Sequence, residues 1–157
     1  MDITATPKKS FYAYQERDIN SVFEEMESAP NRRLLYQLPT GGGKTVVFSE
    51  IARRFIEQFG QTVIILTHRK ELCSQTSATL KKTGVQNRII SSTSGNFKGN
   101  CNCYVAMVET LRNRIKTKKV KVKDVGLVII DEAHHNSFRK LMGNFKKASI
   151  IGVTATP

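Results

Sequence analysis

Residues 38–45 have the sequence Leu-Pro-Thr-Gly-Gly-Gly-Lys-Thr, and this stretch decides the fold. An apolar run at residues 34–38 leads into it, and Val47, Ile51 and Phe55 follow at helical spacing. The glycines therefore lie between a predicted strand and a helix N-terminus, which is the context of a phosphate-binding loop. Glycines let the backbone N–H groups turn inward, and the helix N-terminus adds partial positive charge. The alternative is a glycine-rich turn that caps an ordinary helix.

The side chains of this loop predict the chemistry of its ligand. We expect Lys44 to reach the β- and γ-phosphates of a nucleoside triphosphate, and the Thr45 hydroxyl to ligate Mg²⁺. The rest of the phosphate-binding loop is expected to be Thr40, Gly41, Gly42 and Gly43. One position departs from the common motif, which begins with Gly or Ala, because residue 38 is Leu.

A second motif, Asp-Glu-Ala-His-His at residues 131–135, follows a predicted buried strand. Residues 125–130 are apolar without alternation, as in a strand covered on both faces. At its carboxyl end we expect Asp131 to hold the Mg²⁺ shell, and Glu132 to orient and deprotonate the attacking water. The two histidines could hydrogen-bond onward to a nucleic-acid-sensing element, whereas a solvated acidic turn with core or surface histidines is the alternative.

In chain order, these motifs and several others resemble the first RecA-like lobe of a superfamily two helicase of the DEAD/DEAH-box kind. Phe-Tyr-Ala-Tyr-Gln at residues 11–15 resembles the adenine-recognising Q-motif region, and residues 38–45 match motif I. Residues 65–72 resemble motif Ia, and residues 108–111 resemble a later segment that contacts the nucleic-acid backbone. Residues 131–134 match motif II, and residues 154–156 match motif III. The resemblance covers nearly the whole chain.

The resemblance implies roles for further residues. It implies that Gln15 recognises adenine, so the expected nucleotide is ATP with Mg²⁺. Contacts to the nucleic-acid backbone are implied for Thr67, Arg69 and Thr110. The residues implied to couple hydrolysis to strand binding are His134, Thr154 and Thr156. Leu38-Pro39-Thr40 and the doubled histidine resemble DNA helicases and restriction-type translocases more than DEAD-box RNA helicases.

Length and composition indicate a soluble, globular domain. The chain has 157 residues, of which 39% are hydrophobic and 24% charged, and no apolar stretch approaches the roughly 20 residues of a membrane span. We expect a flexible arm at residues 1–10 and one ATP-binding lobe at residues 11–157. With three cysteines and no secretion signal, an intracellular location is expected, either cytoplasmic or in the nucleoid or nucleus.

The net charge of +12 favours a polyanionic partner. On the motif resemblance above, DNA is the favoured nucleic acid over RNA. One connector is especially basic, and it is either a solvated linker or a nucleic-acid contact; its lysines are Lys116, Lys118, Lys119, Lys121 and Lys123. The chain ends one residue after motif III, so the second RecA-like lobe and its arginine finger are expected to lie outside it. The isolated chain should therefore be nearly inactive.

The hydrophobic pattern predicts an α/β fold of the RecA-like P-loop type, with a mostly parallel sheet and helices on both faces. Strands are expected at residues 34–38, 61–67, 88–90, 104–107, 125–130 and 150–153. Helices are expected at about 15–29, from 44 onward, at 70–82 and through 111–115. The function expected is the ATP-binding lobe of an ATP-dependent helicase or translocase acting on DNA. An RNA helicase lobe and a non-motor nucleic-acid-binding module are the alternatives.

Overall fold

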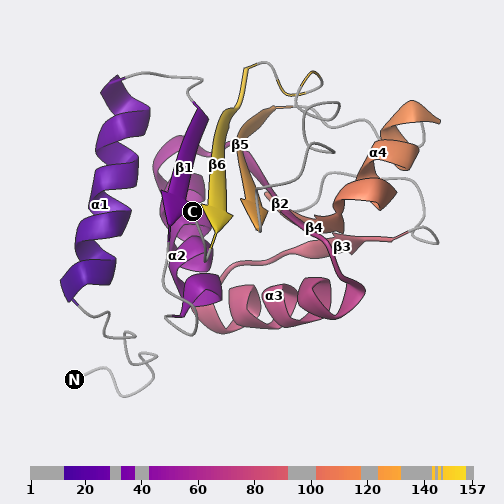
Figure 1. The fold of residues 1–157 in the computed structure, drawn as a ribbon, viewed down its shortest axis with the longest axis horizontal. Helices are drawn as coiled ribbons and strands as arrows, with labels where there is room; N and C mark the ends of the chain where they lie inside the picture. Colours follow the sequence, from indigo (N-terminus) through magenta and orange to yellow (C-terminus); the bar gives the residue numbers. More distant parts are fainter. Residues whose placement is uncertain are drawn as a thin grey trace.

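The computed structural model describes residues 13–28, 33–37, 43–91, 102–117, 124–131, 143, 145 and 147–154. Within these residues lies one six-stranded sheet in the order β1-β6-β5-β2-β4-β3, and every neighbouring pair is parallel (Figure 1). The strands are β1 (Arg33–Gln37), β2 (Thr62–Thr67), β3 (Arg88–Ile90), β4 (Cys103–Met107), β5 (Val125–Asp131) and β6 (Ser149–Thr154). The predicted α/β class and parallel sheet are confirmed.

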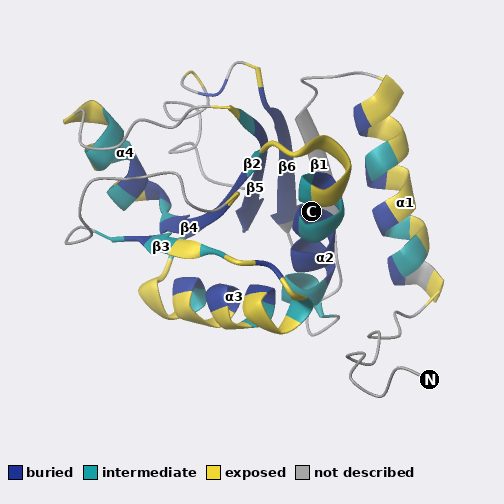
Figure 2. Ribbon diagram, turned by 180° about the vertical axis from the view of Figure 1, so that it is seen from behind, coloured by how far each residue is buried: buried dark blue, intermediate teal, exposed yellow. Residues whose placement is uncertain are grey.

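Helices cover both faces of this sheet, as predicted. They are α1 (Ala13–Ser28), α2 (Lys44–Phe59), α3 (Lys70–Thr83) and α4 (Val108–Lys116). One buried cluster joins α1, α2 and α3 to one face of the sheet, and a second cluster joins α4 to the other face. Along β2, Val63 and Ile65 enter the first cluster, whereas Ile64 and Leu66 enter the second. Figure 2 shows the resulting buried stripes on α1 and α3, whose outer sides are exposed.

The register brings the ends of five strands to one edge of the sheet. Gln37 pairs with Thr154, Asp131 pairs with Val153, and Thr67 pairs with Met107. All of these residues lie at the last position of their strand or next to it. The last residues of β1, β2, β4, β5 and β6, and the described segments that follow β2 and β4, therefore share the carboxyl edge. In open parallel sheets this is the edge at which ligands bind.

Gly126 allows α2 to pack closely on β5. A Cβ atom at this position would lie 2.8 Å from Cζ of Phe55, closer than two carbon atoms can approach, and would also collide with Gln61. Phe55 is buried in the cluster shared by α2 and the sheet. A glycine is therefore required near the start of β5, where no turn or loop would have indicated it.

A charged network stabilises the outer side of α2. The carboxylate of Glu50 is buried and accepts hydrogen bonds from Nε of Arg53 at 2.6 Å and Nε of Arg54 at 2.8 Å. Arg53 also donates to the exposed Glu57 at 2.7 Å. Burial alone would raise the pKa of the Glu50 carboxyl, but the hydrogen bonds and charges of Arg53 and Arg54 outweigh it, so that pKa is lowered. Among the described helices, none combines the length and apolar character that a bilayer span needs.

Replacing Glu50 by Gln should lower the free energy of unfolding by about 1–3 kcal/mol near neutral pH, because two guanidinium groups lose a buried charged acceptor. Glu57→Gln is the matched control, since Glu57 is exposed, and it should change stability by less than about 0.5 kcal/mol. Urea denaturation monitored by circular dichroism gives both values.

The pH dependence of this difference follows from the lowered pKa. Ionised Glu50 makes its full contribution to the free energy of unfolding above its unfolded pKa of about 4.5. This contribution is lost as the pH falls through the lower pKa of the folded state. The stability gap between the wild type and Glu50→Gln should therefore close in acid. A gap that stayed constant down to pH 3 would contradict this assignment.

Candidate nucleotide and nucleic-acid site

The phosphate-binding loop ends at a backbone conformation that favours glycine. Gly43, the N-cap residue of α2, has φ of 73° and ψ of 36°, and its carbonyl accepts the hydrogen bond from Val47 N at 3.0 Å. A residue with a side chain would be strained in this left-handed conformation. The α2 axis therefore begins at Lys44, and its N-terminal N–H groups face the carboxyl edge of the sheet.

Lys44 and Asp131 meet at this edge. Nζ of Lys44 lies 2.7 Å from Oδ1 of Asp131, and the Asp131 side chain is almost completely buried. The ion pair therefore joins the first residue of α2 to the last residue of β5. Two residues 87 positions apart in the sequence are thus brought together, as motifs I and II of the resemblance require.

The described residues fit a magnesium nucleotide. Oδ1 of Asp131 is buried and accepts no hydrogen bond of good geometry from the described residues, so its polar contact there is the Lys44 ammonium. A buried carboxylate oxygen in this position suits a hard cation, and a neighbouring lysine suits a phosphate. Thr45 is partly exposed in the first turn of α2, one residue after Lys44, so its hydroxyl is available to the same site.

Gln15 lies against the same loop. A Cβ atom on Gly43 would be 3.2 Å from Nε2 of Gln15, so the carboxamide packs on the backbone where α2 begins. Gln15 is 6% exposed, an unusually deep position for an amide side chain in the first turn of a helix. Its place beside the loop is consistent with the adenine-recognising role that the resemblance implies.

Thr67 and Arg69 follow β2, and only Arg69 presents its side chain at the surface. The Thr67 side chain is fully buried; its hydroxyl contacts Sγ of Cys73 at 3.0 Å and donates to the carbonyl of Arg69 at 3.2 Å. The Thr67 side chain therefore points into the protein, and a contact between this residue and nucleic acid stays a prediction. The hydroxyl of Thr67 holds the turn into α3 and so sets the position of Arg69.

Sequence reasoning did not identify Cys73 as the partner of Thr67. Its contact with a residue six positions earlier depends on the geometry of the turn between them, which local periodicity does not reveal. Burial raises the pKa of the Cys73 thiol, although the hydrogen bond with Thr67 acts in the opposite direction. Cys73 is therefore a structural thiol of this turn.

Thr110 and Thr154 also lie near the carboxyl edge. Thr110 is in the first turn of α4, directly after β4, and its side chain is partly exposed. Thr154 is the last residue of β6, so its backbone lies between the ends of β1 and β5. The expected site residues outside the described part of the chain are Thr40, Gly41, Gly42, Glu132, His134 and Thr156. Their roles stay predictions.

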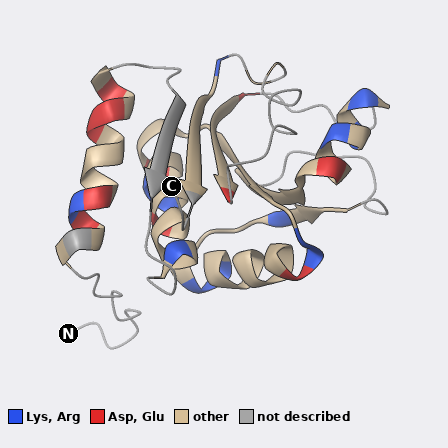
Figure 3. Ribbon diagram, in the orientation of Figure 1, with Lys and Arg blue, Asp and Glu red and all other residues tan. Residues whose placement is uncertain are grey.

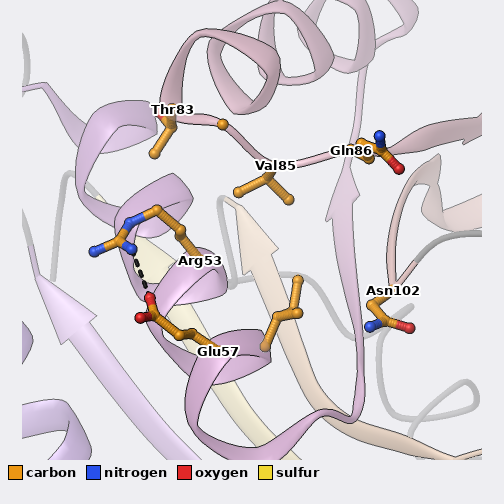
Figure 4. A pocket seen from close by; sticks show the side chains of 8 residues that line it. Arg53, Glu57, Thr83, Val85, Gln86 and Asn102 are labelled. Carbon is orange, nitrogen blue, oxygen red and sulfur yellow. Dashed lines mark hydrogen bonds and ion pairs between the residues drawn. The ribbon is translucent and has the colours of Figure 1, made fainter. Parts of the chain in front are cut away.

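A cavity of about 550 Å³ lies away from these residues (Figure 4). Its walls come from the last turns of α2, the end of α3 and the segment before β4, and they include the ion pair between Arg53 and Glu57. Because α2 and α3 end at the amino edge of the sheet, this cavity is separate from the Lys44–Asp131 site.

Comparisons with known proteins agree with this geometry. The family model described as "Type III restriction enzyme, res subunit" matches residues 3–157. The Saccharomyces cerevisiae protein named putative ATP-dependent helicase IRC3 is 35% identical over 91% of this chain and 23% of its own length. A subunit named Type I restriction enzyme EcoAI endonuclease subunit, from Escherichia coli, is 29% identical over 95% of this chain and 20% of its own length.

Among solved structures, the UvsW helicase from bacteriophage T4 superimposes with a TM-score of 0.75 at 18% identity, covering 99% of this chain and 56% of that one. At this identity the superposition shows a common fold. The chain spans about a quarter of the length of its curated relatives, whose names describe the longer proteins. The family match extends over almost every residue, and the chain belongs to the family of the type III restriction enzyme res subunit.

Proposed function

We propose that this chain is the ATP-binding lobe of an ATP-dependent translocase or helicase that acts on DNA. The observation that carries this proposal is the Lys44–Asp131 ion pair, which joins the start of α2 to the end of β5 at the carboxyl edge. Both groups occupy the positions that phosphate binding and metal binding require in P-loop nucleotide hydrolases. Family membership supports the same assignment.

In the proposed mechanism, the ion pair exchanges partners when ATP binds. Lys44 would turn from Asp131 to the β- and γ-phosphates, and Asp131 and Thr45 are the residues that would hold Mg²⁺. A bound magnesium ion would neutralise charge that develops on the phosphate oxygens. Glu132, the residue after Asp131, is proposed to hold the attacking water and take its proton. Because Lys44 and Asp131 are already paired, neither charge is left buried without a partner before ATP arrives.

The distribution of charge supports nucleic-acid binding beside α3 and α4 (Figure 3). The helix next to β1, α1, is acidic, with five carboxylates and one arginine; these are Glu16, Asp18, Glu24, Glu25, Glu27 and Arg17. By contrast, α4 carries Arg112, Arg114 and Lys116 against one acid, Glu109. A polyanion would therefore be repelled from the α1 side. Arg114 and Lys116 lie in the last turn of α4, away from the end of β4, so among the described residues the exposed basic side chains nearest the carboxyl edge are Arg69 and Lys70 after β2.

This placement brings the proposed nucleic-acid residues close to the nucleotide. The start of α3 after β2 is three strand spacings from β1, or about 14 Å along the sheet. Arg69 is exposed there, and Thr110 lies after the next strand, β4. Two strands lie between β1, which leads to the proposed phosphate-binding loop, and β2, which leads to Arg69. These are β6, which ends at the backbone of Thr154, and β5, which ends at Asp131. A coupling role for Thr154, Thr156 and His134 is proposed on this arrangement and on the resemblance.

DNA is proposed over RNA because the matching family and the Escherichia coli relative are named for restriction enzymes. An RNA strand would reach the same edge and is the alternative.

The proposal includes a second RecA-like lobe that completes the ATP site in the whole protein. It also includes an intracellular setting, with which the buried thiols Cys73 and Cys103 are consistent. The Lys44–Asp131 pair argues against a non-motor module, since a scaffold needs neither group.

Lys44→Ala should weaken ATP binding by at least about 2 kcal/mol, or roughly 30-fold, because one charge-assisted contact to the phosphates is lost. Calorimetric titration with Mg·ATP measures this change. Lys81→Ala is the control, since Lys81 is an exposed lysine in the last turn of α3. Removing Lys44 also leaves Asp131 without its partner, so circular dichroism must show that the variant is folded. An unchanged ATP affinity in a folded variant would overturn the assignment.

Glu132→Gln should retain ATP affinity but reduce steady-state turnover by about 10²- to 10⁴-fold, because proton removal from water contributes to the transition state and not to binding. The assay compares the dissociation constant for ATP with kcat in the whole protein. Turnover at the wild-type rate would remove Glu132 from this role.

Arg69→Ala should weaken single-stranded DNA binding and reduce the slope of log K against log salt concentration by about 0.7, the contribution of one phosphate contact. Fluorescence anisotropy at several salt concentrations measures both quantities. Arg88→Ala removes the same charge at the amino edge of the sheet, where β3 begins, and should leave the salt slope unchanged. Equal effects of the two substitutions would mean that DNA binding depends on the net charge of the protein and not on a phosphate contact of Arg69.

A further inference from the structure

Arg54, far along α2 from the phosphate-binding loop, connects that helix to the element that carries Gln15. We propose that Arg54 is a positioning residue for nucleotide recognition: through Glu16 it fixes the first turn of α1 and so holds the Gln15 carboxamide against the backbone at Gly43. The inference rests on the proposed ATP-binding function and extends it to a residue that lies in none of the helicase motifs.

The contacts of Arg54 join two helices, α1 and α2. Its Nε donates to Glu50 at 2.8 Å within α2, and its Nη2 donates to Oε1 of Glu16 at 2.9 Å on α1. Nη1 reaches Oδ1 of Asn20, one turn further along α1, at 3.5 Å. Because Glu50 is buried and anchors the near side of the guanidinium, the far side is held in a fixed direction toward α1.

These polar contacts restrict sliding of α1 along its own axis, which the apolar contacts between the helices restrict less. Buried side chains of α1, among them Ile19, Val22 and Met26, hold this helix against the core. Apolar packing is not directional, so it resists separation more than a small slide along the helix axis. The hydrogen bonds to Glu16 and Asn20 do have a direction, and they fix the position of α1 along that axis.

The position of α1 matters because Gln15 immediately precedes Glu16. Its Nε2 would be only 3.2 Å from a Cβ atom on Gly43, so a small shift of the first turn would change this contact. A carboxamide that recognises a base must present its donor and acceptor to within about 0.5 Å. The selectivity of nucleotide binding should therefore depend on Arg54, whose hydrogen bonds among the described residues go to Glu16, Asn20 and Glu50.

Arg53 provides a matched control. It has the same charge and also donates to Glu50, but its other acceptor is Glu57 on its own helix. Replacing either arginine leaves the other paired with Glu50, so the buried carboxylate keeps a partner in both variants. Of the two substitutions, only Arg54→Gln removes hydrogen bonds to α1. The hydrogen bond from Gln58 of α2 to Glu27 of α1, at 3.3 Å, remains in both variants.

The test is a titration of the wild type, Arg54→Gln and Arg53→Gln with Mg·ATP and Mg·GTP, followed by fluorescence of methylanthraniloyl-labelled nucleotides. For Arg54→Gln we expect ATP affinity to fall about fivefold, with GTP affinity unchanged. The ratio of the dissociation constants for GTP and ATP should therefore fall by the same factor. Arg53→Gln should keep the wild-type preference. In the whole protein, kcat at saturating ATP should be unchanged by Arg54→Gln, and Arg54→Lys should restore part of the preference.

Glu16→Ala is the second variant, because it removes the acceptor of the 2.9 Å hydrogen bond on α1 and leaves the network of α2 intact. It should narrow the ATP preference as Arg54→Gln does, and the double variant should show no further loss. Equal loss of ATP and GTP affinity, or an unchanged preference in both single variants, would overturn the role of Arg54. A wild type that binds neither nucleotide would instead overturn the proposed function. Equal wild-type affinity for ATP and GTP would overturn the adenine recognition on which the inference depends.

Discussion

The ion pair between Lys44 and Asp131 is the interaction on which the candidate site depends. It lies at the carboxyl edge, where one group starts α2 and the other ends β5. Both partners are largely removed from water, so each would be costly to bury alone. The pairing satisfies both charges in the absence of nucleotide, and each charge suits a different part of a magnesium nucleotide.

The parallel sheet explains why such a pair can form. Every described strand pairing is parallel, so the last residues of the strands and the segments that follow them collect at one edge. The strand order then divides this edge into two parts. The nucleotide residues gather at β1 and β5, and the exposed Arg69 and partly exposed Thr110 lie after β2 and β4. The two proposed ligands can therefore be neighbours without sharing residues.

Two supporting arrangements hold the residues that face these ligands. The buried hydroxyl of Thr67 ties the turn after β2 to Cys73 and so presents Arg69 at the surface. The network around Glu50 ties α1 to α2 through Arg54 and so places Gln15 beside Gly43. In both cases a buried polar group, fully hydrogen-bonded, sets the position of a residue at the site. Such groups would cost stability if they lost their partners, which gives them a defined geometry.

The sequence by itself determined the local elements and the identity of the loop. Glycines before Lys44, the apolar run before Asp131 and the helical periodicity of α2 depend on nearby residues, so a local pattern reveals them. Pairs within α2, such as Glu50 with Arg54, also follow from helical spacing. Only the tertiary structure decided the strand order, the Lys44–Asp131 contact, the burial of Thr67 and the bond between Glu16 and Arg54. These features join segments far apart in the chain or depend on how a turn is packed, and short-range periodicity carries no information about either.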